Sequence, residues 1–256
     1  MTRQNERKMK LYMEAGLAVL LVLTIALASA AGLLSPQAGE RDKNKKETAA
    51  VQEKSQDQKK NDSDSIESQE TIADGQYPIM GDSRITVSEM VDYFQASGKP
   101  YPKEALSKGG AESIEEFCQM YYDEASAEGV RPEVAFVQTM KETGFLQYGG
   151  DASIEQFNFA GLGATGGGVA GADFSSYGKD GVRMGIRAQV QHLKCYANKE
   201  ALINPCVDPR WGEWLRGKAP YVEWLGIKEN PYGTGWAAGA DYGNNIVKLI
   251  KSTKAL

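Results

Sequence analysis

After a basic segment at residues 1–14, the chain divides into three blocks that differ in how apolar and polar residues are arranged. Residues 15–34 contain no charged residue, and residues 35–76 contain no aromatic and hardly any large aliphatic residue. From residue 77 onward, apolar residues recur every three or four positions, as in helices packed on a core. We therefore expect a transmembrane helix at 15–34, a disordered linker at 35–76 and a folded domain at 77–256.

Apolar spacing and capping residues predict the limits of the first helices in the folded domain. One helix is expected at 88–96. A second follows the capping sequence Ser113-Ile-Glu-Glu116 and ends at Gly129. A third runs from Pro132, which suits a first helical turn, to Gly144, which suits a helix end.

Two further helices and one irregular region complete the expected fold. A fourth helix is marked by the apolar residues Ile186, Val190, Leu193 and Ala197, and its other face carries Arg187, Gln191 and Lys194. A last helix is expected at 242–251. Strand signals are weak, and residues 157–181 could form a small hairpin or an irregular lobe. The domain is therefore expected to be mostly α, with a small loop or β lobe.

Basic residues before the apolar run predict the orientation of the N-terminus. Residues 1–14 include Arg3, Arg7, Lys8 and Lys10, which place this end in the cytoplasm and the folded domain outside the cell. The run at 15–34 is longer than a usual signal-peptide core, which favours a single-pass signal anchor in the cell membrane. The alternative is a signal peptide that is cut after Ala28-Ser-Ala30, which would leave a secreted protein.

Net charge limits the partners of the folded domain, and cysteine content limits its disulfide cross-links. The 256-residue chain has a formal net charge of −5, which argues against a nucleic-acid partner. Its three cysteines, Cys118, Cys195 and Cys206, are too few for a disulfide scaffold. Free buried thiols are the favoured interpretation, and a Cys195–Cys206 disulfide is the alternative if the domain is exported.

The sequence Gln138-Thr-Met-Lys-Glu-Thr-Gly144 suggests a catalytic acid. Glu142 lies near the end of the third predicted helix, one turn after Gln138, so both side chains project from one face. A glycine-rich stretch follows at 158–168 and looks like a loop that approaches another molecule closely. A glutamate at a helix end beside an open groove suits the general acid of a glycosidase. The alternative is an ordinary exposed glutamate.

Three separated motifs resemble the bacterial glucosaminidase family that cuts peptidoglycan, glycoside hydrolase family 73. They are Glu142-Thr-Gly, Asn158-Phe-Ala-Gly-Leu-Gly and Gly185-Ile-Arg-Ala-Gln-Val-Gln-His-Leu193, and they occur in the family's order. The resemblance extends over about residues 114–250. It implies a lysozyme-like fold and cleavage of the β-1,4 bond after N-acetylglucosamine, with Glu142 as the general acid.

The second catalytic group is left open by this resemblance. Some family members use a second carboxylate after the glycine-rich loop, where this chain offers Asp173 and Asp180. The alternatives are that both are ordinary loop acids, or that the N-acetyl group of the substrate is the nucleophile.

The remaining predicted site residues would bind the sugar chain. They are Gln138, Tyr148, Asn158, Phe159, Gly161, Trp236 and Tyr242, and the aromatic rings among them are expected to stack on pyranose faces. Tyr242 also matches a tyrosine that recurs near the end of the domain in the resembling family. Packing is the expected role of Trp211, Trp214 and Trp224, and a structural role is expected for His192. No cofactor is expected and no metal site, because one histidine and scattered cysteines give no ligand spacing.

Two other functions compete with a glucosaminidase. A lytic transglycosylase also works from one glutamate on a related fold, but that class usually has a Gly-Leu-Met-Gln segment where this chain has Ala160-Gly-Leu-Gly163. A catalytically silent wall-binding module would keep the fold without the reaction. The expected partners are peptidoglycan glycan strands and, through the N-terminal helix, the membrane.

Overall fold

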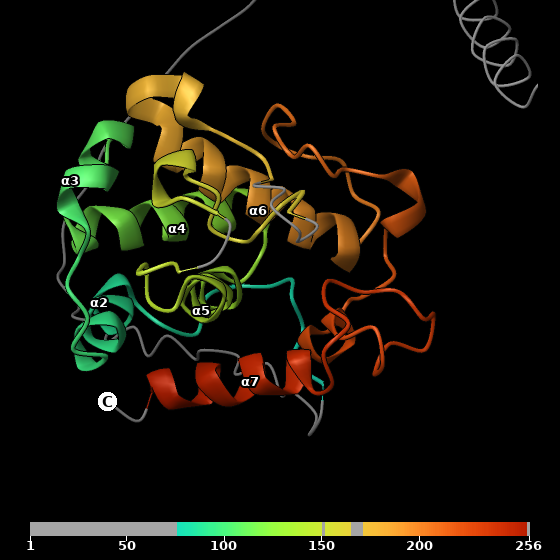
Figure 1. Cartoon of the computed structure of the whole chain (residues 1–256). Helices are drawn as coiled ribbons and strands as arrows, with labels where there is room; N and C mark the ends of the chain where they lie inside the picture. Colours follow the sequence, from blue (N-terminus) through green and yellow to red (C-terminus); the bar gives the residue numbers. More distant parts are fainter. Residues whose placement is uncertain (1–75, 150–151, 165–170, 255–256) are drawn as a thin grey trace, which may run out of the picture. The chain divides into compact units, whose positions relative to one another are not determined.

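Helices dominate the computed structural model, which describes residues 76–149, 152–164 and 171–254 (Figure 1). The α-helices of these residues are α2 (Val87–Ala96), α3 (Lys103–Leu106), α4 (Ile114–Glu128), α5 (Pro132–Thr143), α6 (Gly181–Ala197) and α7 (Tyr242–Thr253). Short 3-10 helices lie between them: η1 (Ser107–Gly109), η2 (Ile154–Gln156), η3 (Ser175–Asp180), η4 (Glu213–Leu215) and η5 (Val222–Leu225). The arrangement fits a lysozyme-like, all-α domain.

The predicted helix limits agree with the structure because local capping decides them. Ser113 begins α4 by accepting a hydrogen bond from the amide of Glu116. Gly129 and Gly144 follow α4 and α5 with left-handed φ angles of 72° and 58°, which glycine adopts without strain. Pro132 occupies the first turn of α5 as expected.

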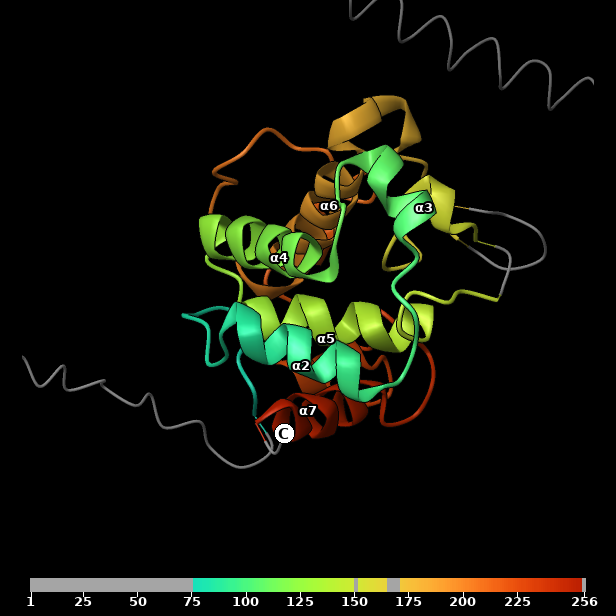
Figure 2. The ribbon, with the colours of Figure 1, turned by 90° about the vertical axis from the view of Figure 1, so that its left-hand side faces the viewer.

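Helix α5 is the centre of the domain. Every residue from 131 to 140 is buried, including the polar residues Gln138 and Thr139. The helix contacts α2, α4, α6 and α7, and Figures 1 and 2 show it enclosed between them. It reaches the surface at Lys141 and Glu142, which are exposed. A helix that is buried nearly all round therefore holds one polar end at the surface.

The first described residues are tied to distant parts of the chain. Isolated β-bridges join Pro78 to Tyr221 and Met80 to Val130. The amide of Tyr77 donates a hydrogen bond of 2.9 Å to the Glu223 carboxylate. Within the described residues the β structure consists of isolated bridges only. Of the predicted lobe at 157–181, the described residues 157–164 and 171–174 are irregular and η3 follows them, whereas residues 165–170 lie outside the described residues.

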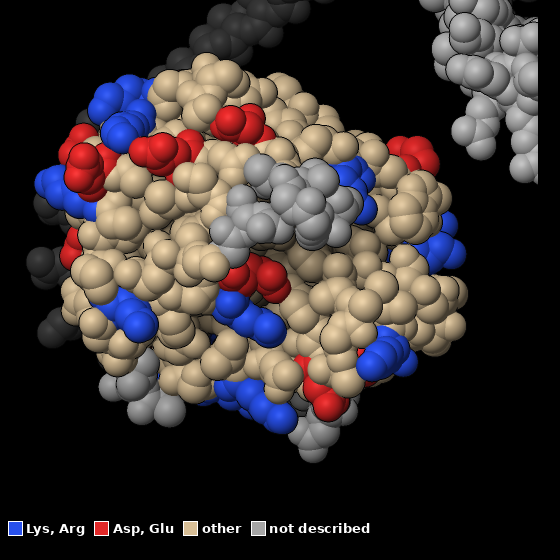
Figure 3. Space-filling view, in the orientation of Figure 1, with Lys and Arg blue, Asp and Glu red and all other residues tan. Residues whose placement is uncertain are grey.

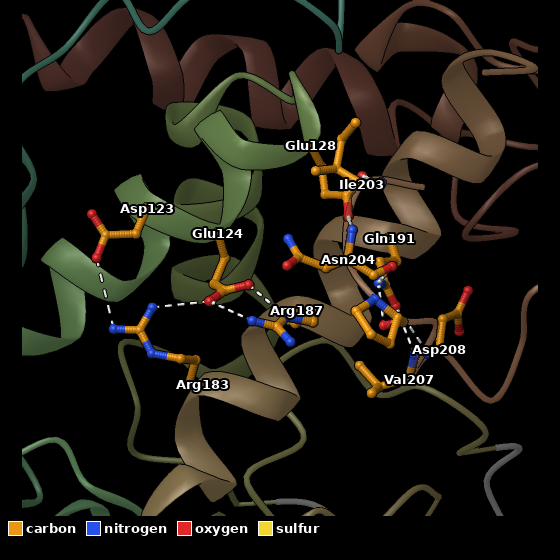
Figure 4. A network of polar contacts seen from close by, with 11 residues as sticks. Asp123, Glu124, Glu128, Arg183, Arg187, Gln191, Ile203, Asn204, Val207 and Asp208 are labelled. Atoms are coloured by element: carbon orange, nitrogen blue, oxygen red, sulfur yellow. Dashed lines mark hydrogen bonds and ion pairs between the residues drawn. The ribbon is translucent and has the colours of Figure 1, made fainter. Parts of the chain in front are cut away.

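Helix α6 is buried on its apolar face and on its polar face. Side chains of the polar face hold an irregular segment of the chain in place (Figure 4). Glu124 of α4 bonds Arg183 at 2.9 Å and Arg187 at 2.7 Å. Further along α6, the Gln191 side-chain oxygen accepts the amide of Val207 at 2.8 Å. Polar contacts therefore hold residues 198–208 against α4 and α6, and not the packing of regularly spaced apolar side chains.

The N-terminal predictions lie outside the described residues. This holds for the transmembrane helix at 15–34, for the basic segment before it and for nearly all of the linker at 35–76. Among residues 76–149, 152–164 and 171–254, no helix has the length and apolar character needed to span a membrane.

Candidate active site

Glu142 is exposed at the carboxyl end of α5, and one of its oxygens is held by a buried tyrosine. The Tyr242 hydroxyl donates a 2.6 Å hydrogen bond to Glu142 Oε1. Between the described residues, no hydrogen bond or ion pair engages Glu142 Oε2. The carboxyl group therefore presents one fixed oxygen and one oxygen that can face a substrate.

The N-terminus of α7 brings Tyr242 to Glu142. Tyr242 is the first residue of α7, and its ring is 6% exposed. Gly243 next to it allows the close approach of α7 to η5, because a Cβ there would lie 2.0 Å from the Val222 carbonyl oxygen. Burial raises the pKa of Tyr242 well above its ordinary value, and the neighbouring Glu142 carboxylate raises it further. The phenol therefore stays protonated and remains a donor.

Gln138 lies behind Tyr242 and is not a surface residue. Its side chain is fully buried, and its Nε2 donates a 3.0 Å hydrogen bond to the Tyr242 hydroxyl. Lys141, beside Glu142, lies with its ammonium group 5.1 Å from the centre of the Tyr242 ring. The prediction that Gln138 and Glu142 share a helix face is confirmed. Direct sugar binding by Gln138 is not compatible with its burial.

The segment after α5 has an unusual backbone. Phe145, Leu146 and Tyr148 have φ angles of 57°, 65° and 55°, a left-handed conformation that non-glycine residues rarely adopt. The Leu146 amide is held by the Thr143 hydroxyl at 2.9 Å, and the Tyr148 hydroxyl donates to the Asn158 carbonyl oxygen at 3.2 Å. Such strain persists where surrounding contacts over-determine the chain, and it is concentrated beside binding sites.

Asn158 holds the glycine-rich loop together. Its side chain is buried, donates to the carbonyl oxygens of Leu162 and Ala172, and accepts the amide of Leu162 at 2.9 Å. Gly161, within this turn, is exposed with a φ angle of 62°. The structure thus assigns Asn158 a role in shaping the loop and leaves Gly161 at its surface.

The aromatic residues differ from the expected sugar platform. Phe159 is 1% exposed and packs edge-on against Phe117 of α4 at 5.1 Å, so its ring cannot stack on a sugar in this structure. The Tyr242 ring is buried as well. Trp236 is partly exposed and packs against His192 at 4.9 Å. Tyr148 and Trp236 therefore remain the stacking candidates.

The tryptophans expected to pack divide into two groups. Trp211 and Trp224 are partly buried and lie against the core. Trp214, by contrast, is 67% exposed, so its expected packing role is wrong. In η4 the neighbouring Leu215 is the buried residue, and Trp214 is exposed to solvent.

Asp173 and Asp180 are both exposed, near the start of α6. Asp173 accepts the Ser175 amide at 2.8 Å, and the Ser175 hydroxyl and amide lower the pKa of its carboxyl group below the ordinary value of 3.8. Asp180 immediately precedes α6 without capping it through its side chain. Among the described residues, no hydrogen bond or ion pair joins either aspartate to Glu142.

The other polar candidates have structural surroundings. The buried His192 Nδ1 lies 2.8 Å from Asp208 Oδ2, and among the described residues no hydrogen bond joins His192 to Glu142. Cys118, Cys195 and Cys206 are free, and Cys206 is exposed. Within the described part of the chain, no group of three or more His, Cys, Asp or Glu side chains is placed to hold a metal ion.

The surface around this end of α5 is not strongly charged. Figure 3 views the molecule along the axis of α5. The visible face carries scattered charged groups of both signs and a large uncharged area. No field of one sign covers the visible part. Such a face suits an uncharged sugar chain better than a polyanion such as a nucleic acid.

Comparisons with known proteins identify the family of this chain. Residues 118–255 match the glucosaminidase family, described as mannosyl-glycoprotein endo-beta-N-acetylglucosaminidase. A protein of Borreliella burgdorferi, described as an uncharacterized protein, is 36% identical over 133 residues. These are 52% of this chain and 59% of the relative, so the chain matches about three fifths of that protein's length. No solved structure matches the chain significantly.

The matched region contains all the helices that build the site. It includes α5 with Glu142, the Asn158 loop, α6 and α7 with Tyr242. The family match covers more than half of the 256 residues and bears out the resemblance seen in the three motifs. The chain belongs to the glucosaminidase family, glycoside hydrolase family 73.

Proposed function

We propose that this protein cleaves the β-1,4 glycosidic bond after N-acetylglucosamine in peptidoglycan glycan strands, with Glu142 as the general acid. The observation that carries the proposal is the 2.6 Å hydrogen bond from Tyr242 to Glu142 at the exposed end of α5. A buried helix that ends in a single, oriented and accessible carboxyl group is the arrangement that proton donation to a glycosidic oxygen requires.

In the proposed reaction, Glu142 Oε2 carries the proton. Tyr242 occupies Oε1, so the proton is transferred from Oε2 to the glycosidic oxygen as the bond from that oxygen to the anomeric carbon breaks. The oxygen of a water molecule then bonds to the anomeric carbon, and the proton that this water gives up restores the Glu142 acid. The group that stabilises the anomeric carbon is Asp173, Asp180 or the substrate's own N-acetyl oxygen.

The cellular setting is part of the proposal. The basic residues 1–14 and the uncharged run 15–34 support a single-pass signal anchor in the cell membrane, with the enzyme domain outside the cell. The polar residues 35–76 would then be a flexible spacer that lets the domain reach the wall. Secretion after cleavage near Ala30 is the alternative.

Mass spectrometry of the fragments released from purified peptidoglycan tests the reaction. The full-length protein is expected to release glycan fragments with reducing N-acetylglucosamine ends. Anhydro-muramic ends would instead identify a lytic transglycosylase, which shares the single glutamate but not the hydrolytic step. If a folded protein that binds the wall releases no fragments, it is a silent binding module.

A further inference from the structure

Resting on the proposed function, we propose that Gln189 of α6 is a positioning residue for the general acid. It makes no contact with Glu142. It acts through Gln138 and Tyr242, by fixing the direction of a buried chain of hydrogen bonds that ends on Glu142 Oε1. That direction decides which carboxyl oxygen carries the transferable proton.

The chain of hydrogen bonds lies in the core of the domain. Gln189, Gln138, Thr139 and Tyr121 are all 0% exposed. Gln189 Nε2 donates to Gln138 Oε1 at 2.9 Å, Gln138 Nε2 donates to the Tyr242 hydroxyl at 3.0 Å, and Tyr242 donates to Glu142 at 2.6 Å. Buried amides that are linked in this way are costly to leave unpaired, so the chain behaves as a unit.

A backbone carbonyl sets the direction of this chain. Gln189 Nε2 also donates to the Ala135 carbonyl oxygen at 3.0 Å, and a carbonyl oxygen can only accept. The amide nitrogen of Gln189 must therefore face α5, and its second proton goes to Gln138 Oε1. Gln138 then has only its nitrogen to offer Tyr242. The Tyr242 oxygen accepts this hydrogen bond, and its single proton is directed to Glu142.

The opposite end of Gln189 favours the same orientation. Gln189 Oε1 lies 2.8 Å from the hydroxyl groups of both Tyr121 and Thr139, which are 2.6 Å from each other. Two hydroxyl protons serve these three contacts, so at least one of them is donated to Gln189 Oε1. A flipped amide would place its oxygen against the Ala135 and Gln138 oxygens, which have no proton to share. The Gln189 amide therefore has one favourable orientation.

The consequence concerns the two oxygens of Glu142. In a carboxylic acid the carbonyl oxygen is the stronger acceptor, so with Tyr242 as a donor Oε1 is the carbonyl oxygen and the acidic proton is placed on Oε2. If the chain ran in the opposite direction, Tyr242 would donate to Gln138 and accept from Glu142. The acidic proton would then be held on Oε1, inside the protein and away from the glycosidic oxygen.

A matched pair of substitutions in α6 tests this inference in the full-length protein. Gln189→Met removes the amide while keeping its volume. Gln191→Met changes an equally buried amide two residues along, which bonds Val207 and Pro205 and has no link to Tyr242. Both variants are expected to be less stable. Only Gln189→Met is expected to lower kcat, by about tenfold to a hundredfold, with KM for soluble glycan fragments unchanged.

A second variant keeps the test informative if Gln189→Met does not fold. Gln138→Glu keeps the size of the side chain, but its carboxylate only accepts, so it turns the Tyr242 proton away from Glu142. We expect a fall in kcat of the same size and a changed pH–rate profile. If Gln138→Glu, or a folded Gln189→Met, keeps the wild-type kcat, the inference is wrong.

The proposed function fails on a different result. Glu142→Gln with undiminished activity would remove Glu142 as the general acid. An inactive Glu142→Gln together with a fully active Gln189→Met would leave the reaction in place and exclude only the positioning role.

Discussion

At the scale of single residues, the site is built on the contrast between an exposed acid and its buried neighbours. Glu142 is exposed, whereas Tyr242 and Gln138 behind it are nearly or fully buried. The buried pair has one orientation, so the exposed carboxyl group does not need to be ordered by the substrate. A carboxyl group that is oriented before the substrate binds is preorganised for proton transfer, and its position at the end of a buried helix provides this orientation.

The hydroxyl group of Tyr242 is predicted to contribute to catalysis. Tyr242→Phe removes the hydrogen bond to Glu142 and leaves the ring in place, so kcat should fall by about tenfold to a hundredfold. The free energy of unfolding should fall by about 1–3 kcal/mol, because Gln138 loses its buried acceptor. Steady-state kinetics and thermal unfolding measure the two effects.

The control for this change is Tyr232→Phe. Tyr232 is 59% exposed, so loss of its hydroxyl group should change neither kcat nor stability. Equal kinetic constants for Tyr242→Phe and the wild type would show that the 2.6 Å contact has no part in the reaction.

Asp173 is the better candidate for a second catalytic carboxylate. Its carboxylate accepts the Ser175 amide at 2.8 Å, and the Ser175 hydroxyl and amide lower its pKa, which favours the ionised form that a nucleophile or base needs. If a carboxylate is needed, Asp173→Asn should lower kcat by at least about a hundredfold, and Asp180→Asn should not. Full activity in both variants would assign the nucleophile to the substrate's N-acetyl group.

Residue identity alone could predict Glu142 but not the roles of its neighbours. Glu142 was found because a motif and a helix end coincide. Phe159 could not be identified as a core residue, since its burial depends on Phe117, which is supplied by a helix some 40 residues earlier. Gln189 was missed, although a glutamine between apolar helix positions is a signal of a buried polar contact.

At the scale of elements, local sequence determines where α5 begins and ends, whereas the polar side of α6 takes part in long-range contacts. The ends of α5 were predictable because Pro132 and Gly144 act locally. The path of residues 198–217 was not predictable, because long-range contacts from α4 and α6 decide it. Glu128 illustrates this: it bonds Lys194 at 2.9 Å and accepts the amides of Ile203 and Asn204 at 3.0 and 2.9 Å.

Glu128 is predicted to make the domain sensitive to acid. Burial alone would raise its pKa, but hydrogen bonds from the Ile203 and Asn204 amides and from Lys194 outweigh burial and lower it. Because the folded-state pKa lies below the ordinary value of 4.5, its contribution to stability is complete above that pH. The contribution is lost as the pH falls through the folded-state pKa.

The test is Glu128→Gln, which leaves the buried Lys194 without its charge partner. At pH 7 the free energy of unfolding should fall by about 3–5 kcal/mol, and the difference from the wild type should shrink below pH 4.5. Denaturant unfolding at several pH values measures both. Glu213→Gln, which breaks an exposed ion pair with Arg216, should not lower the melting temperature. A pH-independent difference for Glu128→Gln would contradict the linkage.

At the scale of the whole molecule, the prediction concerns topology. The basic start and the uncharged run at 15–34 predict that protease added to intact cells without an outer-membrane barrier cuts within residues 35–76 and releases the folded domain. Complete protection of the domain would exclude the outside orientation. A mature N-terminus at Ala31 would show that the segment is a cleaved signal peptide.

The central claim is that Glu142 donates the proton that breaks the glycosidic bond, and Glu142→Gln tests it most directly. The amide keeps the size of the side chain but cannot act as an acid, so the rate of peptidoglycan hydrolysis should fall by about 100- to 10,000-fold. Stability should change by less than about 1 kcal/mol, because the side chain is exposed. Binding to insoluble wall should persist, and Glu115→Gln, an exposed glutamate of α4, should keep full activity. A folded Glu142→Gln that still hydrolyses peptidoglycan at nearly the wild-type rate would contradict the assignment of the active site.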